Sequence, residues 1–189
     1  MKKIVVVCDS REPQARAVTH LTEQVCSQYD WAIEKIHADA LLLSDCIGCF
    51  GCWVKTPGLC VLTKDQGNDM ARTVLSGTHL VFVSRVTWGG YSASIKKCAD
   101  RMLPLLHPDF RKVNGQMHHI MRYPHMPRML AVGYGAVSPS EVRCFHTYTA
   151  AHACNMDTKL GQRAFIWPEQ HQDPEPAAYT RWLSEEVCA

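Results

Sequence analysis

The chain has 189 residues, of which 47% are hydrophobic and 20% charged, and its net charge at pH 7 is +2. This length suits one domain with a sizeable apolar core, and the small net charge argues against a nucleic-acid partner. The apolar run at residues 4–7 is too short for an export signal or a membrane span, so we expect a cytoplasmic protein. In a reducing compartment its ten cysteines indicate metal or redox chemistry more than structural disulfides.

The N-terminal segment predicts a strand, a polar turn and a helix. Residues 3–8 form a mostly β-branched run, typical of a strand buried on both faces, and apolar spacing predicts a helix over about 15–29. The turn between them, residues 9–16, offers a serine hydroxyl, arginine side chains and free helix N–H groups, which are the donors that a phosphate needs. It contains no glycine, and taken alone this favours an ordinary capped turn with solvated arginines.

A shorter second strand is predicted at 31–37, and a cysteine-rich segment at 44–62 follows it. Four thiols have the spacing C-x2-C-x2-C-x7-C, at Cys46, Cys49, Cys52 and Cys60. The first three begin a ferredoxin-type ligand set, so the four are candidate ligands of one [4Fe–4S] cluster. Zinc also binds four thiolates, usually between two separated C-x2-C pairs. A reduced loop that lines a pocket or an interface, or forms a redox disulfide, is the third alternative, and the spacing alone does not choose.

The middle of the chain predicts a helix over 65–75 and the strongest strand over 78–86. The segment after this strand is Thr87-Trp88-Gly89-Gly90-Tyr91, followed by a helix over about 92–106. Ligands of open α/β sheets bind at such carboxyl ends of buried strands. Its glycines let a flat ligand approach the backbone, and Trp88 and Tyr91 offer stacking faces. The alternative is that Trp88 is an ordinary core or interface aromatic.

The last third begins with an irregular stretch at 107–127, for which we expect a long loop acting as a lid or a dimer contact. Its histidines are interpreted as solvated rather than metal-bound. A strand at 128–134 ends at Gly133-Tyr134-Gly135, and Ser138-Pro139 is a strong N-cap for a helix over 140–153. A strand at 161–167 and a helix at 174–187 complete the chain.

Five strands thus alternate with helices. Right-handed crossovers between them predict an α/β three-layer sandwich with a parallel five-stranded sheet, as a single domain over residues 1–189. We assign the remaining cysteines no role beyond packing; they are Cys8, Cys26, Cys98, Cys144, Cys154 and Cys188.

Together these motifs resemble the flavodoxin-like NAD(P)H-dependent FMN reductases, and among them the iron–sulfur flavoproteins. The resemblance rests on the cysteine segment 46–60 with Lys64-Asp65, on segment 84–101 ending in Asp100-Arg101, and on five βα units that suit the sheet order 2-1-3-4-5. The family's usual first loop is Gly-Ser-Pro-Arg followed by Gly-Asn-Thr, which this chain lacks. An arginine at the phosphate would compensate for the missing neutral donors.

The resemblance implies FMN, with its phosphate in the first turn and its ring against the loop after the third strand. By position, the phosphate residues are Ser10, Arg11, Gln14, Ala15 and Arg16. The residues implied for the ribityl chain and the ring are Val86, Thr87, Trp88, Gly89, Gly90 and Tyr91, with Gly133, Tyr134 and Gly135 at the ring edge.

The function that this implies is an FMN-dependent oxidoreductase that takes electrons from NAD(P)H or from a protein donor and passes them to an acceptor. Its four cysteines would hold a [4Fe–4S] cluster that relays single electrons, and the protein would be a homodimer or homotetramer. No dedicated catalytic side chain is expected, because the flavin carries the chemistry. Two alternatives stay open: a flavodoxin-like electron carrier, and a flavin or quinone reductase without a cluster.

Overall fold

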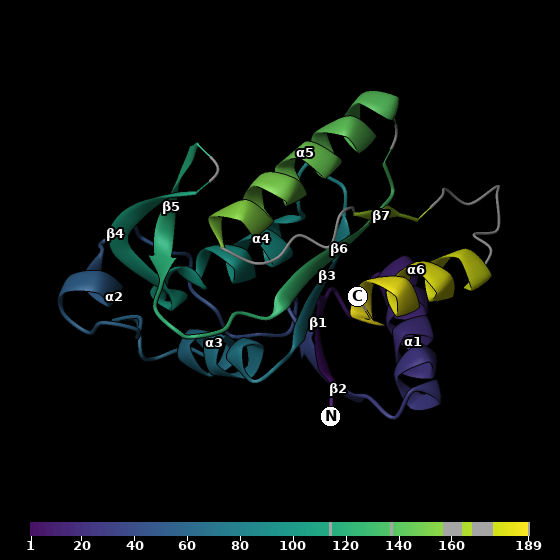
Figure 1. Cartoon of the computed structure of the whole chain (residues 1–189), viewed down its shortest axis with the longest axis horizontal. Helices are drawn as coiled ribbons and strands as arrows, with labels where there is room; N and C mark the ends of the chain where they lie inside the picture. The colour runs from purple at the N-terminus through teal and green to yellow at the C-terminus, as the bar shows by residue number, and fades with distance from the viewer. Residues whose placement is uncertain (114, 137, 157–163, 168–175, 189) are drawn as a thin grey trace.

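Five parallel strands form the central sheet of the computed structural model, which describes residues 1–113, 115–136, 138–156, 164–167 and 176–188 (Figure 1). The strands in spatial order are β2 (Ala32–His37), β1 (Lys3–Cys8), β3 (His79–Arg85), β6 (Arg128–Tyr134) and β7 (Phe165–Ile166). Every pairing within this sheet is parallel. Counted along this sheet alone, the order is 2-1-3-4-5, so the predicted flavodoxin-like α/β fold is confirmed.

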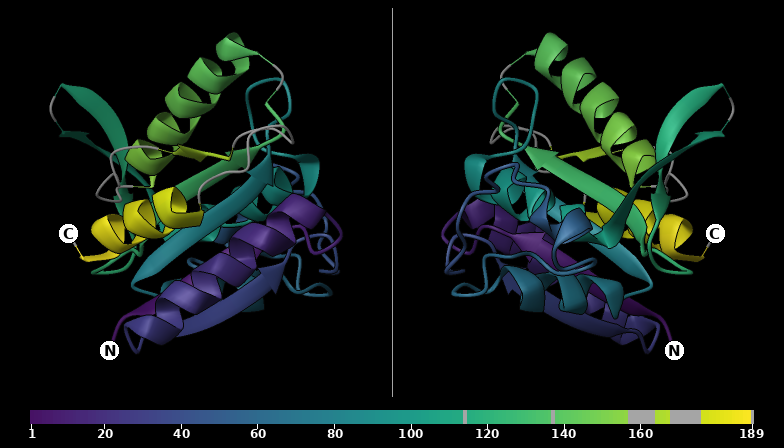
Figure 2. Two further views of the ribbon diagram at one scale, coloured as in Figure 1. Left: turned by 90° about the vertical axis from the view of Figure 1, so that its right-hand side faces the viewer. Right: turned by 90° about the vertical axis from the view of Figure 1, so that its left-hand side faces the viewer.

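Helices cover both faces of the sheet, as the two side views show (Figure 2). Helices α1 (Pro13–Gln28) and α6 (Pro176–Cys188) lie on one face. On the other face lie α3 (Gly67–Leu75), α4 (Ala93–Asp100) and α5 (Pro139–Asn155). Successive residues of a strand alternate between the two layers: Val6 packs on the α1 side and Val5 on the other. Burial on both faces explains why the strands are continuous apolar runs.

The ends of the helices are set by capping residues and prolines in the sequence. The hydroxyl of Ser138 accepts the Glu141 N–H at 3.2 Å, which is the predicted cap of α5. Helix α4 is shorter than predicted: it ends at Asp100, and a 3₁₀ turn, η1 (Leu103–Leu105), follows with Pro104 inside it. The described parts of the last two predicted elements are β7 and α6, while residues 161–163 and 174–175 lie outside the described residues.

The expectation of an irregular loop at 107–127 is wrong. Strands β4 (Leu106–Val113) and β5 (Gln116–Met121) pair antiparallel as a separate hairpin. Asn-Gly is the sequence that hairpin turns favour, and Gly115 has the positive φ of 83° that such a turn requires. Buried His118 on β5 lies 3.5 Å from the Cys154 thiol on α5, so the hairpin is attached to the body of the protein.

Candidate functional site

The first turn, between β1 and α1, is held by a carboxylate from the neighbouring strand. Asp39 follows β2, and its Oδ1 accepts the backbone N–H of Ser10 at 2.7 Å. The Ser10 hydroxyl donates to Oδ2 of the same carboxylate at 3.0 Å, and Arg11 Nε lies 3.4 Å from it. Two of the predicted phosphate residues are therefore already bound to an anionic group of the chain itself.

The other predicted phosphate residues are arranged differently. Arg16 Nη1 donates to the carbonyl oxygens of Ser10 and Arg11 at 3.0 and 2.8 Å, so its side chain folds back over the turn. Ala15 is fully buried and offers only its backbone N–H, while Gln14 is partly exposed at the start of α1. The donors of Ser10, Arg11 and Arg16 are thus engaged by groups of the chain itself.

The predicted ring segment forms a tight two-residue turn. The backbones of Thr87 and Gly90 exchange hydrogen bonds of 3.0 and 2.9 Å, with Trp88 and Gly89 between them at φ 52° and 78°. These angles match a type I′ turn. The Trp88 side chain is 93% exposed, so its face is free for a ligand. A side chain at Gly89 would collide with Cys144 on α5, so this glycine also serves packing.

Three of the other predicted ring residues, Val86, Tyr91 and Tyr134, lie in the core. Val86 is buried and donates its N–H to the carbonyl of Tyr134 at 2.8 Å. Tyr91 is 6% exposed and packs among Phe82, Phe145, Tyr148 and His152, so it offers no open stacking face here. Tyr134 is buried as well, between Gly133 and Gly135. The expectation of two stacking aromatics therefore reduces to Trp88 alone.

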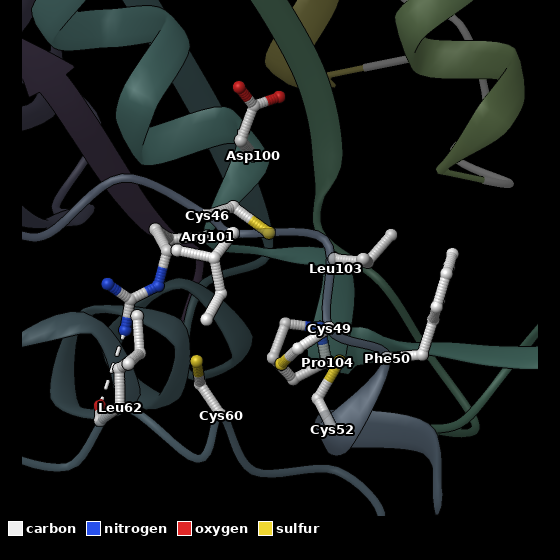
Figure 3. Close-up of a pocket in the computed structure, with 11 residues that line it drawn as sticks. Cys46, Cys49, Phe50, Cys52, Cys60, Leu62, Asp100, Arg101, Leu103 and Pro104 are labelled. Atoms are coloured by element: carbon white, nitrogen blue, oxygen red, sulfur yellow. Dashed lines mark hydrogen bonds between the residues drawn. The ribbon is translucent and has the colours of Figure 1, made fainter.

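The four predicted thiol ligands lie around one space (Figure 3). Cys46, Cys49, Cys52 and Cys60 all line a single pocket, whose other walls come from the same segment, the end of α4 and η1. Helix α2 (Gly51–Val54) carries Cys52, which is buried. Burial raises the pKa of the Cys52 thiol, and the neighbouring thiols act in the same direction.

A buried ion pair closes the base of the cysteine segment. Arg101, at the end of α4, forms a bidentate pair with Asp65 at 2.6 and 3.0 Å. Its guanidinium also donates to the carbonyl of Ser44 at 2.7 Å, ahead of the first cysteine, while Asp65 accepts the Ser44 N–H at 2.9 Å. The hydrogen bond from Arg101 holds the pKa of Asp65 well below its usual range. The sequence motif indicated these residues but not that they pair.

Asn68 fastens the other end of the segment. Its amide accepts the Cys60 N–H at 2.8 Å and donates to the Cys60 carbonyl at 3.0 Å. Sequence reasoning missed this residue, because an asparagine in the first turn of a helix resembles any helix-start residue. The contact fixes the backbone of Cys60 to the first turn of α3.

The described residues form no close group of ligands for a single metal ion. Over residues 1–113, 115–136, 138–156, 164–167 and 176–188, no three His, Cys, Asp or Glu side chains are grouped closely enough to hold one metal ion. A zinc ion with bonds of about 2.3 Å would draw its sulfurs tightly together, whereas a cubane holds its ligands farther apart. The Gly51 N–H also points at the Cys49 sulfur at 3.5 Å, a contact of the kind that tunes cluster sulfurs.

A larger open pocket of about 520 Å³ adjoins the cysteine pocket. Cys46, Asp100 and Leu103 line both. The hairpin contributes Phe110, Met117 and His119 to its wall, and α5 contributes His152 and Asn155, followed by Met156 at its C-cap. Trp53 of α2 also packs on His119, with ring centroids 5.1 Å apart, so the cysteine segment contacts the hairpin.

Comparison with known proteins supports the resemblance. No protein-family profile matches the chain. It is 28% identical over 129 residues to an iron-sulfur flavoprotein of Archaeoglobus fulgidus, a match that covers 58% of this chain and 57% of that protein. The chain therefore matches little more than half of the length of this curated relative. The sequence-based resemblance to iron–sulfur flavoproteins is confirmed as a similarity over that part.

Solved structures share the fold at low sequence identity. An NADH:FMN oxidoreductase crystallised in its apo form has a TM-score of 0.66 at 14% identity, covering 100% of this chain and 89% of that one. An FMN-dependent NADH-azoreductase from Bacillus anthracis in complex with FMN has a TM-score of 0.63 at 14% identity, covering 100% and 98%. A flavodoxin, WrbA-like protein from Agrobacterium tumefaciens has a TM-score of 0.54 at 14% identity, covering 99% and 95%. These likenesses establish a flavodoxin-like fold.

Proposed function

We propose that the protein is a flavin-dependent oxidoreductase of the NAD(P)H:FMN type that also carries a [4Fe–4S] cluster on Cys46, Cys49, Cys52 and Cys60. The observation that carries this proposal is the convergence of the four thiols on one pocket within a flavodoxin-like fold. Similarity to an iron-sulfur flavoprotein and to NADH:FMN oxidoreductase and azoreductase structures supports it.

The described residues suit the ring end of FMN better than its phosphate end. Bound FMN would supply hydride-accepting chemistry and a bound cluster one-electron chemistry. At the ring end, Trp88 presents an open face and the backbone of Thr87 and Gly90 is held in a rigid turn. At the phosphate end the donors of Ser10 and Arg11 are engaged by Asp39, so this end does not fit a phosphate as it stands.

Arg101 and three apolar residues surround the thiols at the cysteine pocket. Arg101 places a guanidinium beside the segment and is tied to the residues before the first cysteine and after the fourth, which balances thiolate charge and fixes the loop. Leu62, Leu103 and Pro104 give the pocket apolar walls, while Cys46 and Cys49 are exposed to solvent.

The adjoining open pocket suits a small-molecule donor or acceptor. Its volume of about 520 Å³ lies in the range of about 300–1,000 Å³ usual for small-molecule sites. Because Cys46 lines both pockets, a molecule bound there would lie beside the cluster ligands. The same proposal places the protein in the cytoplasm as a homodimer or homotetramer. No helix in the described part of the chain combines the length and apolar character needed to cross a bilayer.

The test is a composition measurement on protein purified without oxygen. Iron, zinc and acid-labile sulfide are quantified per chain, flavin binding is measured by titration, and NAD(P)H oxidation is followed with FMN in excess. We expect about four iron and four sulfide per chain, one flavin bound and measurable NAD(P)H oxidation. Flavin binding without iron would leave a clusterless reductase, and flavin binding without NAD(P)H oxidation an electron carrier. Zinc in place of iron would contradict the cluster.

A further inference from the structure

We propose that the Asp39 carboxylate takes the place of the flavin phosphate in the first turn, so that the protein binds FMN only by displacing Asp39 and prefers a flavin without the phosphate. This inference rests on the proposed function, because it specifies which flavin the site takes. The donors expected to bind a phosphate are bound to Asp39 instead.

Asp39 reaches the turn because of the sheet order. Strands β1 and β2 are neighbours and end together, with Cys8 paired to His37. Asp39 therefore emerges beside the N-terminus of α1, where a phosphate would meet free N–H groups. Its two oxygens accept the Ser10 N–H at 2.7 Å and the Ser10 hydroxyl at 3.1 and 3.0 Å, and Arg11 Nε lies at 3.4 Å. One carboxylate thus uses the backbone, hydroxyl and guanidinium donors that would otherwise hold an anion.

The charge of Asp39 is maintained in this position. Partial burial raises the pKa of Asp39, but hydrogen bonds from the Ser10 backbone and hydroxyl outweigh it and leave the pKa below its usual value. The group is therefore ionised at neutral pH. A phosphate could not enter beside it without bringing like charges together.

Two further acids lie at the same edge of the sheet. Asp9 is buried and accepts hydrogen bonds from the hydroxyls of Ser92 and Ser94, and Glu12 lies 3.7 Å from Arg85. The arginines of the turn are engaged too: Arg11 faces Asp39, and Arg16 donates to two backbone carbonyls. The local charges are balanced by the chain itself, which leaves no excess of positive charge for a phosphate dianion.

The competing explanation is that Asp39 only shapes the turn. The Asp39→Asn variant distinguishes the two, because an asparagine oxygen still accepts the Ser10 N–H but carries no charge. The matched control is Asp69→Asn, which removes an exposed aspartate paired with Arg72 on α3. Each protein is titrated with FMN and with riboflavin by flavin fluorescence, and its thermal unfolding is followed with and without inorganic phosphate.

We expect wild type and D69N to bind riboflavin at least as tightly as FMN. In D39N we expect FMN affinity to rise about ten- to a hundredfold while riboflavin affinity stays within about twofold, since only FMN carries the charge that Asp39 opposes. Phosphate should raise the unfolding temperature of D39N more than that of wild type. An unchanged or lower FMN-to-riboflavin ratio in D39N overturns the inference.

Unfolding with inorganic phosphate distinguishes a wrong role for Asp39 from a wrong proposed function. If no protein binds either flavin, the proposed function fails. A phosphate-dependent rise in the unfolding temperature of D39N alone then still supports Asp39 as a substitute for a bound anion. No such rise, with no flavin binding, overturns both.

Discussion

Arg101 and Asp65 form a bidentate ion pair that lies almost wholly inside the protein, with side chains 1% and 4% exposed. Neither residue lies between the first and the fourth cysteine, yet through Ser44 and Leu62 the pair joins the two ends of the cysteine segment. A side chain at Gly67 would collide with the guanidinium, so the first residue of α3 is a glycine for this reason. The geometry of the thiols therefore depends on a contact between α4 and the start of α3.

Replacing Arg101 by methionine should lower the free energy of unfolding by about 3–5 kcal/mol, because Asp65 is left buried and unpaired. Urea denaturation measures this loss. The double variant Arg101→Met with Asp65→Asn should recover part of it, since no uncompensated charge remains. Arg72→Met, which breaks the exposed pair with Asp69, is the control and should stay within about 0.5 kcal/mol of wild type. Equal losses in R101M and R72M would contradict the role given to the buried pair.

Replacing Cys49 by serine should remove iron and acid-labile sulfide from the protein. A serine hydroxyl remains protonated at neutral pH and is a poor ligand for iron, so three thiolates would be left to hold the cluster. Cys188→Ser is the control, because Cys188 is exposed at the end of α6 and lies outside the pocket. Iron and sulfide are measured per chain on anaerobically purified protein. Unchanged content in C49S would remove Cys49 from the ligand set.

Replacing Trp88 by alanine should weaken flavin binding about two- to tenfold, the amount expected when one aromatic stacking contact is lost. Stability should change by less than about 0.5 kcal/mol, because the side chain is 93% exposed. Fluorescence titration with riboflavin gives the affinity, and thermal unfolding gives the stability. Unaltered riboflavin affinity would place the ring away from this turn.

Replacing Gly89 by valine should destabilise the protein, whether or not flavin is present. The residue has a φ of 78°, which valine adopts only with strain, and its Cβ would collide with Cys144. Thermal unfolding without flavin measures the effect. Gly90→Ala is the control, since a Cβ there would have its nearest neighbour, the Thr87 oxygen, at 3.7 Å. If G89V and G90A unfold at the same temperature, the packing of this turn on α5 is not required for stability.

The pH dependence of stability should include a contribution from His79 at the start of β3. Burial lowers its pKa to about 4 from an ordinary value of 6.5, and the charges of Lys2 and Arg128 act in the same direction. The unfolded chain then binds a proton that the folded protein does not, so stability falls as pH drops from about 6.5 to 4, by as much as ~3 kcal/mol. His79→Gln should flatten this part of the curve, and exposed His20→Gln should not. Urea denaturation at a series of pH values provides the measurement.

The central sheet could be predicted because its long strands are continuous apolar runs in the sequence. Runs such as residues 3–8 and 128–134 are buried on both faces, so their apolar character is continuous and their bounds are sharp. The hairpin was missed because its strands alternate weakly and include histidines, which apolar periodicity does not count. The Asn114-Gly115 pair is a sequence signal for a hairpin turn in this stretch.

The candidate site was predictable in part, for a physical reason. The four thiols are close in sequence, so local spacing alone indicates that they can meet. The contacts of Asp39 with Ser10 and of Arg101 with Asp65 join residues 29 and 36 positions apart, and only the sheet order brings them together. Long-range ion pairs of this kind leave no periodic trace in a sequence, so the state of the first turn could not be deduced from its residue types.

The packing of Trp53 on His119 has a consequence for how the protein opens. Residues 46–60 contain little regular structure besides α2, and they rest on a hairpin that is separate from the main sheet. Parts of a protein with few contacts to the core open independently of global unfolding. We therefore expect thiol alkylation of the metal-free protein, and amide exchange in 46–60, 107–113 and 115–121, to proceed together and faster than exchange in β1 and β3. The redox chemistry of the thiols would then follow a local opening, while the sheet beneath them stays folded.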